Sequence, residues 1–215
     1  MKVSEGAGAV EGSSRSRRLW LVRHADPLVA PGTCYGALDI PADATATHLA
    51  AQRLAGALPP QAQVFHSTLQ RCEQLAQSLQ ALRPDLASKP DARLREMAFG
   101  TWEGQAWGTI ARADIDAWTA GFASYRPGGG ENLVSVLARV ADALRSHCDT
   151  TAQLTTAAAQ DVVWITHAGV IRCVAWLQAR GDVLPRSEEW PVAAPGWGQW
   201  EIVPLQAPLQ ARFNN

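Results

Sequence analysis

Two short stretches of the sequence are apolar without interruption and then end in charged or titratable side chains. Leu19–Val22 is followed by Arg23 and His24, and the run that opens "DVVWITHAG" at 161–169 leads into His167. Apolar runs without polar alternation are typical of strands that are buried on both faces of a sheet. Each of these strands therefore brings a histidine to its exit.

Apolar strand-like runs alternate with helical patterns along the chain. The predicted strands are 19–22, 63–67, 92–94, the start of 161–169 and 199–203, and the predicted helices are 47–58, 69–82, a long helix from 131 and 169–180. The apolar stripe of the long helix consists of Leu133, Leu137, Val140 and Leu144. This alternation predicts an α/β fold: a three-layer αβα sandwich with a mostly parallel, doubly wound sheet and helices on both faces.

A single domain is expected over residues 18–215. Residues 1–17 are rich in Gly, Ser and Arg, which is typical of a disordered tail. The segment 104–130 is interpreted as a lid insertion, because it is rich in aromatic residues and ends in "RPGGGEN", where Arg126 would meet an anionic substrate. The alternative is an amphipathic helix with an aromatic core. Trp190, Trp197 and Trp200 are expected to pack on the last strand.

The overall composition argues against a polyanionic partner. The 215 residues carry a formal net charge of −1, so we expect neither nucleic acid nor a membrane surface to be bound. No run approaches the roughly 20 apolar residues of a membrane helix, and the start lacks an apolar secretory segment, which predicts a cytoplasmic protein. The cysteines at 34, 72, 148 and 173 lack metal-ligand spacing and are expected to be free core thiols, with no metal or other cofactor. The oligomeric state is open, a homodimer included.

Ligands of doubly wound sheets lie outside the carboxyl ends of the strands. Four predicted strand exits carry side chains that would meet there: Arg23 and His24, Ser67 and Arg71, Glu96, and Thr166 and His167. Grouped cations repel one another and are costly to desolvate unless an anion pairs with them. Because a guanidinium group can hold two phosphate oxygens at once, a phosphate is the expected partner.

Each of these side chains alone also has an ordinary structural explanation. A single histidine at a strand end is more often structural than catalytic, Ser67 is expected to cap the following helix, and Arg71 alone would be a solvated helix residue. The set as a whole is what predicts a site. The remaining histidines have no comparable setting and are interpreted as structural or exposed: His48, His66 and His147.

The motifs "LVRHADP", "HSTLQRCEQLA", "LREMAFGTWEG" and "WITHAGVIR" occur in this order and resemble those of the histidine phosphatase superfamily, also called the phosphoglycerate mutase-like superfamily. The resemblance implies a phosphohistidine enzyme in which His24 attacks phosphorus and Glu96 donates a proton. It further implies that the phosphoryl group is held by Arg23, Arg71, His167 and Ala168. The chemistry is sound, because a neutral imidazole is a competent nucleophile and fixed Arg and His donors can stabilise phosphoryl oxygens without a metal.

The loop after the first motif departs from the pattern of many family members. They read RHG, then an Asn, then "PLTxxGxxQA", whereas this chain has Ala25, no Asn up to Gly36, and "PADATATHLAAQRLA". The loop "PGTCYGALDIP" instead resembles the α-ribazole phosphatase-like branch, which acts late in cobalamin assembly. That resemblance implies that Tyr35 and Gly36 lie at the pocket mouth; a tight turn with a packed tyrosine is the structural alternative.

The sequence therefore predicts a metal-independent phosphomonoesterase, a hydrolase of the histidine acid phosphatase type, acting on a small phosphomonoester such as α-ribazole 5′-phosphate. One alternative is a mutase that moves phosphate within a sugar acid, and another is a non-catalytic phosphate-binding protein. The presence of all five key residues argues against the non-catalytic alternative. 3-Phosphoglycerate is disfavoured as a substrate, because the sequence locates no further cations for its carboxylate.

Overall fold

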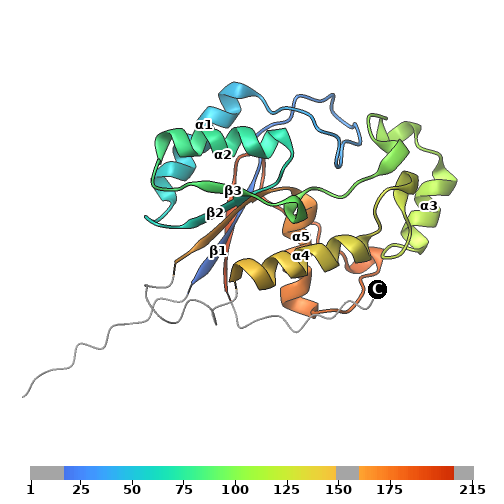
Figure 1. Cartoon of the computed structure of the whole chain (residues 1–215). Coiled ribbons are helices and arrows are strands. Elements are labelled where there is room, and N and C mark those ends of the chain that lie inside the picture. The colour runs from blue at the N-terminus through green and yellow to red at the C-terminus, as the bar shows by residue number, and fades with distance from the viewer. Residues whose placement is uncertain (1–16, 149–159, 206–215) are drawn as a thin grey trace, which may run out of the picture.

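A five-stranded sheet lies at the centre of the computed structural model, which describes residues 17–148 and 160–205 (Figure 1). The strand order is β3-β2-β4-β1-β5, with bounds β1 Arg18–Arg23, β2 Gln63–His66, β3 Ser88–Pro90, β4 Val162–Thr166 and β5 Trp200–Pro204. β3, β2, β4 and β1 are parallel to one another, and β5 is antiparallel to β1. The carboxyl ends of the four parallel strands therefore share one edge of the sheet.

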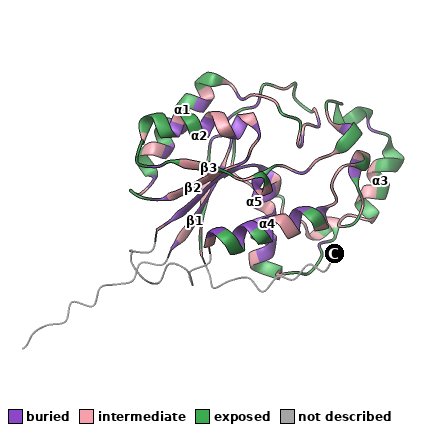
Figure 2. Cartoon of the chain, viewed as in Figure 1, coloured by how far each residue is buried: buried purple, intermediate pink, exposed green. Residues whose placement is uncertain are grey.

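Helices cover both faces of this sheet. α1 (Ala44–Ala57) and α2 (Gln70–Leu82) lie on one face, and α4 (Leu133–Cys148) and α5 (Ala168–Arg180) lie on the other (Figure 1). Because successive strand residues point to opposite faces, Trp20 and Val22 pack into the core under α1 and α2, whereas Leu19 and Leu21 pack into the core under α4 and α5. The central strands are buried (Figure 2). The predicted three-layer αβα sandwich is confirmed.

Most predicted elements differ from the observed ones by one to three residues at an end, and one is of another type. The strand predicted at Ala92–Leu94 is a 3-10 turn, η1, because the Asp91 carboxylate accepts a hydrogen bond from Arg93 N (2.8 Å) and begins the turn. The edge strand β3 comes just before it and ends at Pro90, which has no N–H to continue a ladder. The long helix begins at Leu133 rather than Glu131, because Asn132 Oδ1 accepts from Ser135 N (2.9 Å) as an N-cap does.

The segment 104–130 contains helix α3 (Arg112–Ala120) and short 3-10 turns, η3 (Trp107–Thr109) and η4 (Pro127–Gly129). Trp107 stacks on Trp118 with ring centroids 6.2 Å apart, so the aromatic residues pack together as the structural alternative expects. A Cβ on Gly128 would lie 2.3 Å from Phe99 O, and one on Gly130 would lie 2.1 Å from Ala98 O. These glycines therefore allow close backbone packing, and the opening and closing of a lid stays a prediction.

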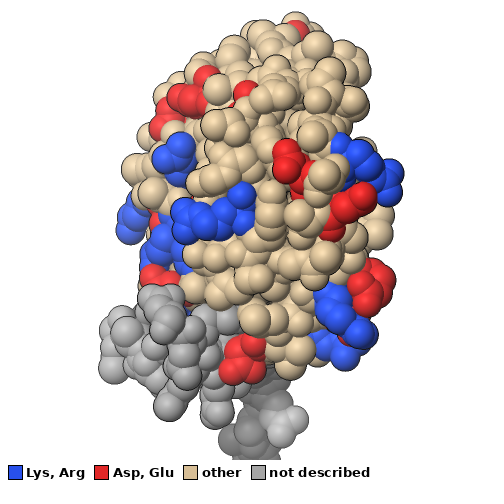
Figure 3. All heavy atoms as spheres, turned by 90° about the vertical axis from the view of Figure 1, so that its right-hand side faces the viewer, with Lys and Arg blue, Asp and Glu red and all other residues tan. Residues whose placement is uncertain are grey.

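Residues 1–16 lie outside the described residues, whereas Arg17 is buried and donates from Nε to Gln160 O (2.9 Å). No helix in the described part of the chain is long and apolar enough to cross a membrane. Figure 3 shows a face on which basic and acidic side chains surround a broad uncharged area. All four cysteines are free, and three of them are buried.

Candidate active site

The carboxyl ends of β1 and β4 bring the two predicted site histidines together. His24 follows β1, and its backbone N donates to Thr166 O at the end of β4 (3.0 Å). His167 follows β4, and the imidazole rings of His24 and His167 lie 5.2 Å apart between centroids. Both side chains are almost completely buried, with 1% of the residue surface exposed in each case.

His24 is held in the tautomer that a nucleophile requires. Its Nδ1 lies 2.7 Å from Ala25 O, and because a carbonyl oxygen can only accept, Nδ1 carries the proton. Burial lowers the pKa of His24 to about 3, and the positive charge of Arg71 acts in the same direction. His24 is therefore neutral near pH 7, with an unprotonated Nε2.

A hydrogen bond with the Ser67 hydroxyl orients the His167 ring. Its Nε2 lies 2.8 Å from Ser67 Oγ, and that hydroxyl also accepts from Leu69 N (3.3 Å). When the Ser67 hydroxyl donates its proton to Nε2, neutral His167 carries its own proton on Nδ1. Burial, followed by the charge of Arg71, holds the pKa of His167 well below its ordinary value. His167 is therefore a neutral hydrogen-bond donor.

The two arginines reach the same edge of the sheet from different elements. Arg71, in the first turn of α2, is completely buried and donates from Nη2 to Gly36 O (2.7 Å) and from Nη1 to Leu38 O (2.8 Å). Its guanidinium also lies 5.3 Å from the ring centroid of Tyr35. Arg23, at the end of β1, donates from Nη1 to Pro195 O (3.1 Å). The loop at 35–38 therefore covers and fixes Arg71.

Glu96 comes from the irregular chain between η1 and η2 (Gly100–Trp102). Its Oε1 accepts from Met97 N (3.0 Å), and its Oε2 accepts from Gly169 N (3.0 Å) at the start of α5. A Cβ on Gly169 would lie only 2.1 Å from Glu96 Oε1. Glycine at this position is thus what allows the carboxylate to rest against the first turn of α5, next to Ala168.

Several nitrogen atoms at this site have no hydrogen-bond partner. Among the described residues, six buried side-chain N atoms lack a partner, and three of them are Arg23 Nε, Arg71 Nε and His167 Nδ1. Buried donors are nearly always satisfied in folded proteins, because an unpaired one costs desolvation free energy. Three such donors on neighbouring residues are suited to an anion. Within residues 17–148 and 160–205, no group of three His, Cys, Asp or Glu side chains is arranged to hold a metal ion.

A cavity of about 350 Å³ opens beside these residues. It reaches Arg23, Glu96, Ala168, Tyr35 and Gly36 among the residues expected from the sequence. Aromatic side chains supply most of its outer wall: Tyr35, Phe99, Trp107, Trp118, Phe122 and Trp190. The buried His24, Arg71 and His167 are not among the residues that line it. The cavity is therefore suited to the body of a substrate, with the buried cluster behind it.

Some sequence expectations need correction. Arg126 is exposed and is not among the cavity-lining residues. Trp190 lines the cavity and contacts Phe122 and Trp176, rather than packing on the last strand. Ser67 is not the N-cap residue of α2, which is Leu69; its hydroxyl instead contacts His167 Nε2 and accepts from Leu69 N.

One charged cavity residue is not among those predicted from the sequence. Arg172 lines the cavity and is held there by Val192 O, which accepts from its Nη2 (3.0 Å) and Nε (3.3 Å). It lies four residues after Ala168 on α5, so the helical spacing places both on one face. That spacing was the signal that could have identified it.

The family model of the histidine phosphatase superfamily (branch 1) matches residues 19–188. The chain belongs to this superfamily. A search of curated proteins finds no match. The family that the four motifs indicate is thus confirmed, whereas the individual roles of His24, Arg23, Arg71, Glu96 and His167 stay predictions.

Solved structures of this superfamily are similar over most of the chain. The native mycobacterial glucosyl-3-phosphoglycerate phosphatase is 26% identical, covers 87% of this chain and 90% of its own, and superposes with a TM-score of 0.72. Its complex with inorganic phosphate gives a TM-score of 0.67 at 26% identity, over 87% of this chain and 89% of that one. TTHB049 from Thermus thermophilus is 31% identical over 86% of this chain and 92% of its own, with a TM-score of 0.61.

Proposed function

We propose that this histidine phosphatase is a metal-independent phosphomonoesterase that works through a phosphohistidine on His24. The observation that carries the proposal is the set of three buried, unpartnered donors on Arg23, Arg71 and His167, which lie around a neutral histidine with an unprotonated Nε2. A phosphoryl group presents three acceptor oxygens and spreads negative charge over them in the transition state. Fixed donors of this kind stabilise that charge.

The reaction proceeds in two displacements. In the first, the lone pair of His24 Nε2 forms a bond to phosphorus, the bond to the ester oxygen breaks, and Glu96 gives a proton to the leaving oxygen. In the second, a water molecule attacks phosphorus, gives a proton to the Glu96 carboxylate, and the phosphorus–nitrogen bond breaks. Its electron pair returns to Nε2, phosphate leaves, and His24 and Glu96 recover their starting states.

The aromatic wall of the cavity indicates a substrate with a sizeable flat or sugar-linked body. Trp107 and Trp118 are stacked, and Phe122 stacks on Trp118 in turn, so the wall offers broad rings to a ligand. Aromatic walls favour ligands that bury a large apolar area and stack on the rings. α-Ribazole 5′-phosphate has this shape, and Tyr35 and Gly36 of the loop that resembles the α-ribazole phosphatase-like branch line the cavity.

A second substrate class is favoured by Arg172. A phosphorylated sugar acid carries a carboxylate, and the sequence had located no cation for such a group beyond the phosphate site. Arg172 supplies one in the cavity wall, and a carboxylate is a natural partner for a guanidinium. The similar mycobacterial protein is a glucosyl-3-phosphoglycerate phosphatase. A glycosylated phosphoglycerate is therefore the second candidate.

The substrate proposal is tested by kcat/KM across a panel with α-ribazole 5′-phosphate, glucosyl-3-phosphoglycerate, 3-phosphoglycerate, nucleoside monophosphates and sugar phosphates. We expect the substrates with a large ring body to have the highest kcat/KM values. Arg172→Gln separates the two candidates, because it should lower kcat/KM by about tenfold or more for a carboxylate-bearing substrate and little for α-ribazole 5′-phosphate. A clear preference for 3-phosphoglycerate would overturn this assignment and support the mutase alternative.

The catalytic proposal is tested by Glu96→Gln. With an alkyl phosphate the lost proton donor should lower kcat/KM by about 100-fold or more. With p-nitrophenyl phosphate, whose phenolate leaves without a proton, the loss should be much smaller. Equal losses with both esters would mean that Glu96 orients the site and donates no proton.

A further inference from the structure

The chain that carries Glu96 has no sheet or helix to fix it at that residue. We call Arg93–Ala98 the Glu96 segment; it leaves the turn η1 (Ala92–Leu94) and continues as irregular chain toward η2. A proton donor must lie within hydrogen-bond reach of the leaving oxygen, and a misplacement of about 1 Å can cost about 100-fold in rate. Contacts that fix this segment therefore bear on catalysis.

One arginine of α4 holds the segment on the side that precedes Glu96. Arg139 Nη1 donates to Arg93 O (2.7 Å) and to Arg95 O (2.6 Å). The same guanidinium donates from Nε to Glu131 Oε1 and from Nη2 to Glu131 Oε2, both at 3.0 Å. This two-bond pairing with a carboxylate fixes the plane of the guanidinium.

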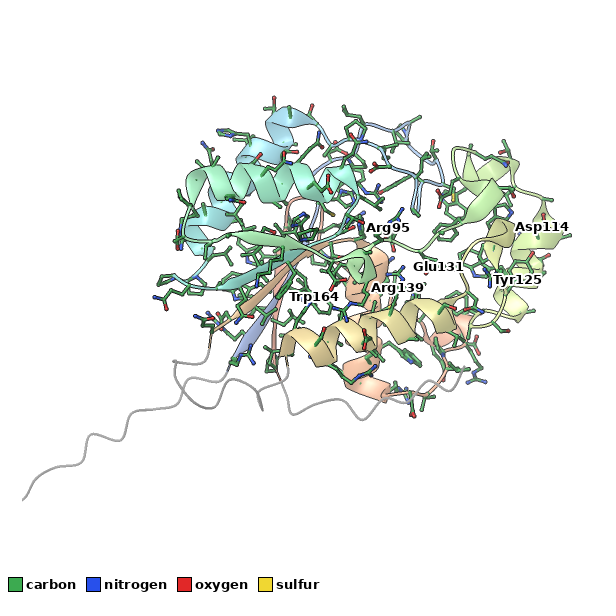
Figure 4. The ribbon with its side chains drawn as sticks, viewed as in Figure 1. Arg95, Asp114, Tyr125, Glu131, Arg139 and Trp164 are labelled. Atoms are coloured by element: carbon green, nitrogen blue, oxygen red, sulfur yellow. The ribbon has the colours of Figure 1, made fainter. Side chains whose placement is uncertain are left out.

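Glu131 holds the segment on the side that follows Glu96. Its Oε2 accepts from Ala98 N (3.0 Å), and its backbone N donates to Ala98 O (2.8 Å). Arg139 and Glu131 lie close together between α4 and the chain at Arg95 (Figure 4). A single ion pair thus contacts the backbone on both sides of Glu96, at positions 93, 95 and 98.

The partners of this pair argue against a purely solvent-facing salt bridge. The side chains of Arg139 and Glu131 are 17% and 29% exposed, so both are largely shielded from water. Their polar groups bond to backbone atoms of the Glu96 segment as well as to each other. The pair therefore connects helix α4, which is anchored in the core through Leu137 and Val140, to an otherwise irregular chain.

We propose that Arg139 and Glu131 are positioning residues that hold Glu96 at the leaving-group oxygen. This inference rests on the proposed function, because it assumes that Glu96 is the proton donor. Neither residue needs to touch the substrate. Loss of the pair frees the backbone at 95 and 98, so the Glu96 carboxylate samples positions from which it cannot reach the leaving oxygen.

The test compares leaving groups in Arg139→Gln and Glu131→Gln. We expect kcat/KM for an alkyl phosphate to fall by about tenfold or more in each variant, and kcat/KM for p-nitrophenyl phosphate to fall several-fold less. In the Glu96→Gln background, Arg139→Gln should cause little further loss with the alkyl ester, because the proton donor is already absent.

Arg83→Gln is a matched control. Arg83 donates to Ala55 O and Leu58 O and pairs with Asp85, so it makes the same kinds of contact at the opposite end of α2 from Arg71. Its substitution should leave unchanged the ratio of kcat/KM for the alkyl phosphate to kcat/KM for p-nitrophenyl phosphate. If Arg139→Gln does not fold, Glu131→Gln and Arg139→Lys carry the same comparison, since a lysine cannot bond to Glu131 and to two carbonyls with one planar group.

Equal losses with both esters, or fully additive losses in the Glu96→Gln background, would overturn the positioning role and leave a structural ion pair. That outcome is distinguishable from failure of the proposed function. If Glu96→Gln itself shows no dependence on the leaving group, Glu96 is not the proton donor, and the positioning role is refuted together with it.

Discussion

Gly169→Ala should disable Glu96 without removing it. The added Cβ would lie 2.1 Å from Glu96 Oε1 and 2.9 Å from its Cδ. Carbon and oxygen atoms do not approach so closely, so the carboxylate must move by about 1 Å or more, a displacement that can cost about 100-fold in rate. The obstructing atom is the end of a flexible side chain, so the carboxylate will move and the fold will remain.

The cost in stability should be small compared with the cost in rate. Alanine is preferred to glycine in a helix by roughly 0.5–1 kcal/mol. Against this gain stands the weakened hydrogen bond from Gly169 N to Glu96 Oε2, now 3.0 Å long, whose loss costs roughly 0.5–1.5 kcal/mol. The melting temperature should therefore change by only a few degrees.

The assay is kcat/KM with an alkyl phosphate and with p-nitrophenyl phosphate, together with a thermal unfolding curve. We expect a loss of about 100-fold with the alkyl ester and a much smaller loss with the nitrophenyl ester. Gly56→Ala in α1 is the matched control, because its new Cβ meets nothing within 4 Å and should affect neither ester. Wild-type turnover of the alkyl ester by Gly169→Ala would refute the placement of the proton donor.

The same geometry leads to three further expected outcomes. Gly36→Ala places a Cβ 2.4 Å from Met97 O, so either the loop that holds Arg71 or the backbone next to Glu96 must shift; kcat/KM should fall with both esters, and wild-type kcat/KM with p-nitrophenyl phosphate would contradict this role of Arg71. The pKa of His24 is lowered to about 3 in the folded protein, so between pH 6.5 and pH 3 the unfolded state binds a proton that the native state does not, and the free energy of unfolding falls as the pH falls. Denaturant unfolding between pH 6 and pH 4 should therefore give His24→Asn a slope of unfolding free energy against pH that is lower than that of the wild type by about 1.4 kcal/mol per pH unit. An unchanged slope would count against a buried neutral His24. The proposed mechanism assigns the charge and the donors to Arg23, Arg71 and His167, so full activity is expected after treatment with EDTA, and activity that is lost and then restored by magnesium would argue for a metal-dependent reaction.

The parts of the fold that follow from local pattern were predictable from the sequence. Leu19–Val22 and Val162–Ile165 are buried on both faces because no polar residue interrupts them, and their exits carry His24 and His167 to the same sheet edge. Parallel strands bring their carboxyl ends together, so the central histidine pair needed no tertiary information. Glu96 was expected at the same edge from a strand at 92–94 that is a 3-10 turn in the structure, and the family motifs implied its role as proton donor.

The parts that depend on long-range packing were not predictable in this way. Ala92–Leu94 contains an apolar residue at each end, as a strand would, but the Asp91 side chain turns the chain there. The contacts of Arg139 with the Glu96 segment join positions more than 40 residues apart, and no local pattern indicates them. Trp190 lines the cavity only because the chain after α5 returns across it.

The most direct test of the account is to locate the phosphoryl group on the enzyme. Wild-type protein is mixed briefly with radiolabelled phosphomonoester, quenched in alkaline denaturant, and the labelled peptide is sequenced. We expect an acid-labile, alkali-stable adduct on His24, formed within the time of one turnover and absent from His24→Ala. Label on a serine or cysteine, or label of equal yield in His24→Ala, would contradict the phosphohistidine mechanism.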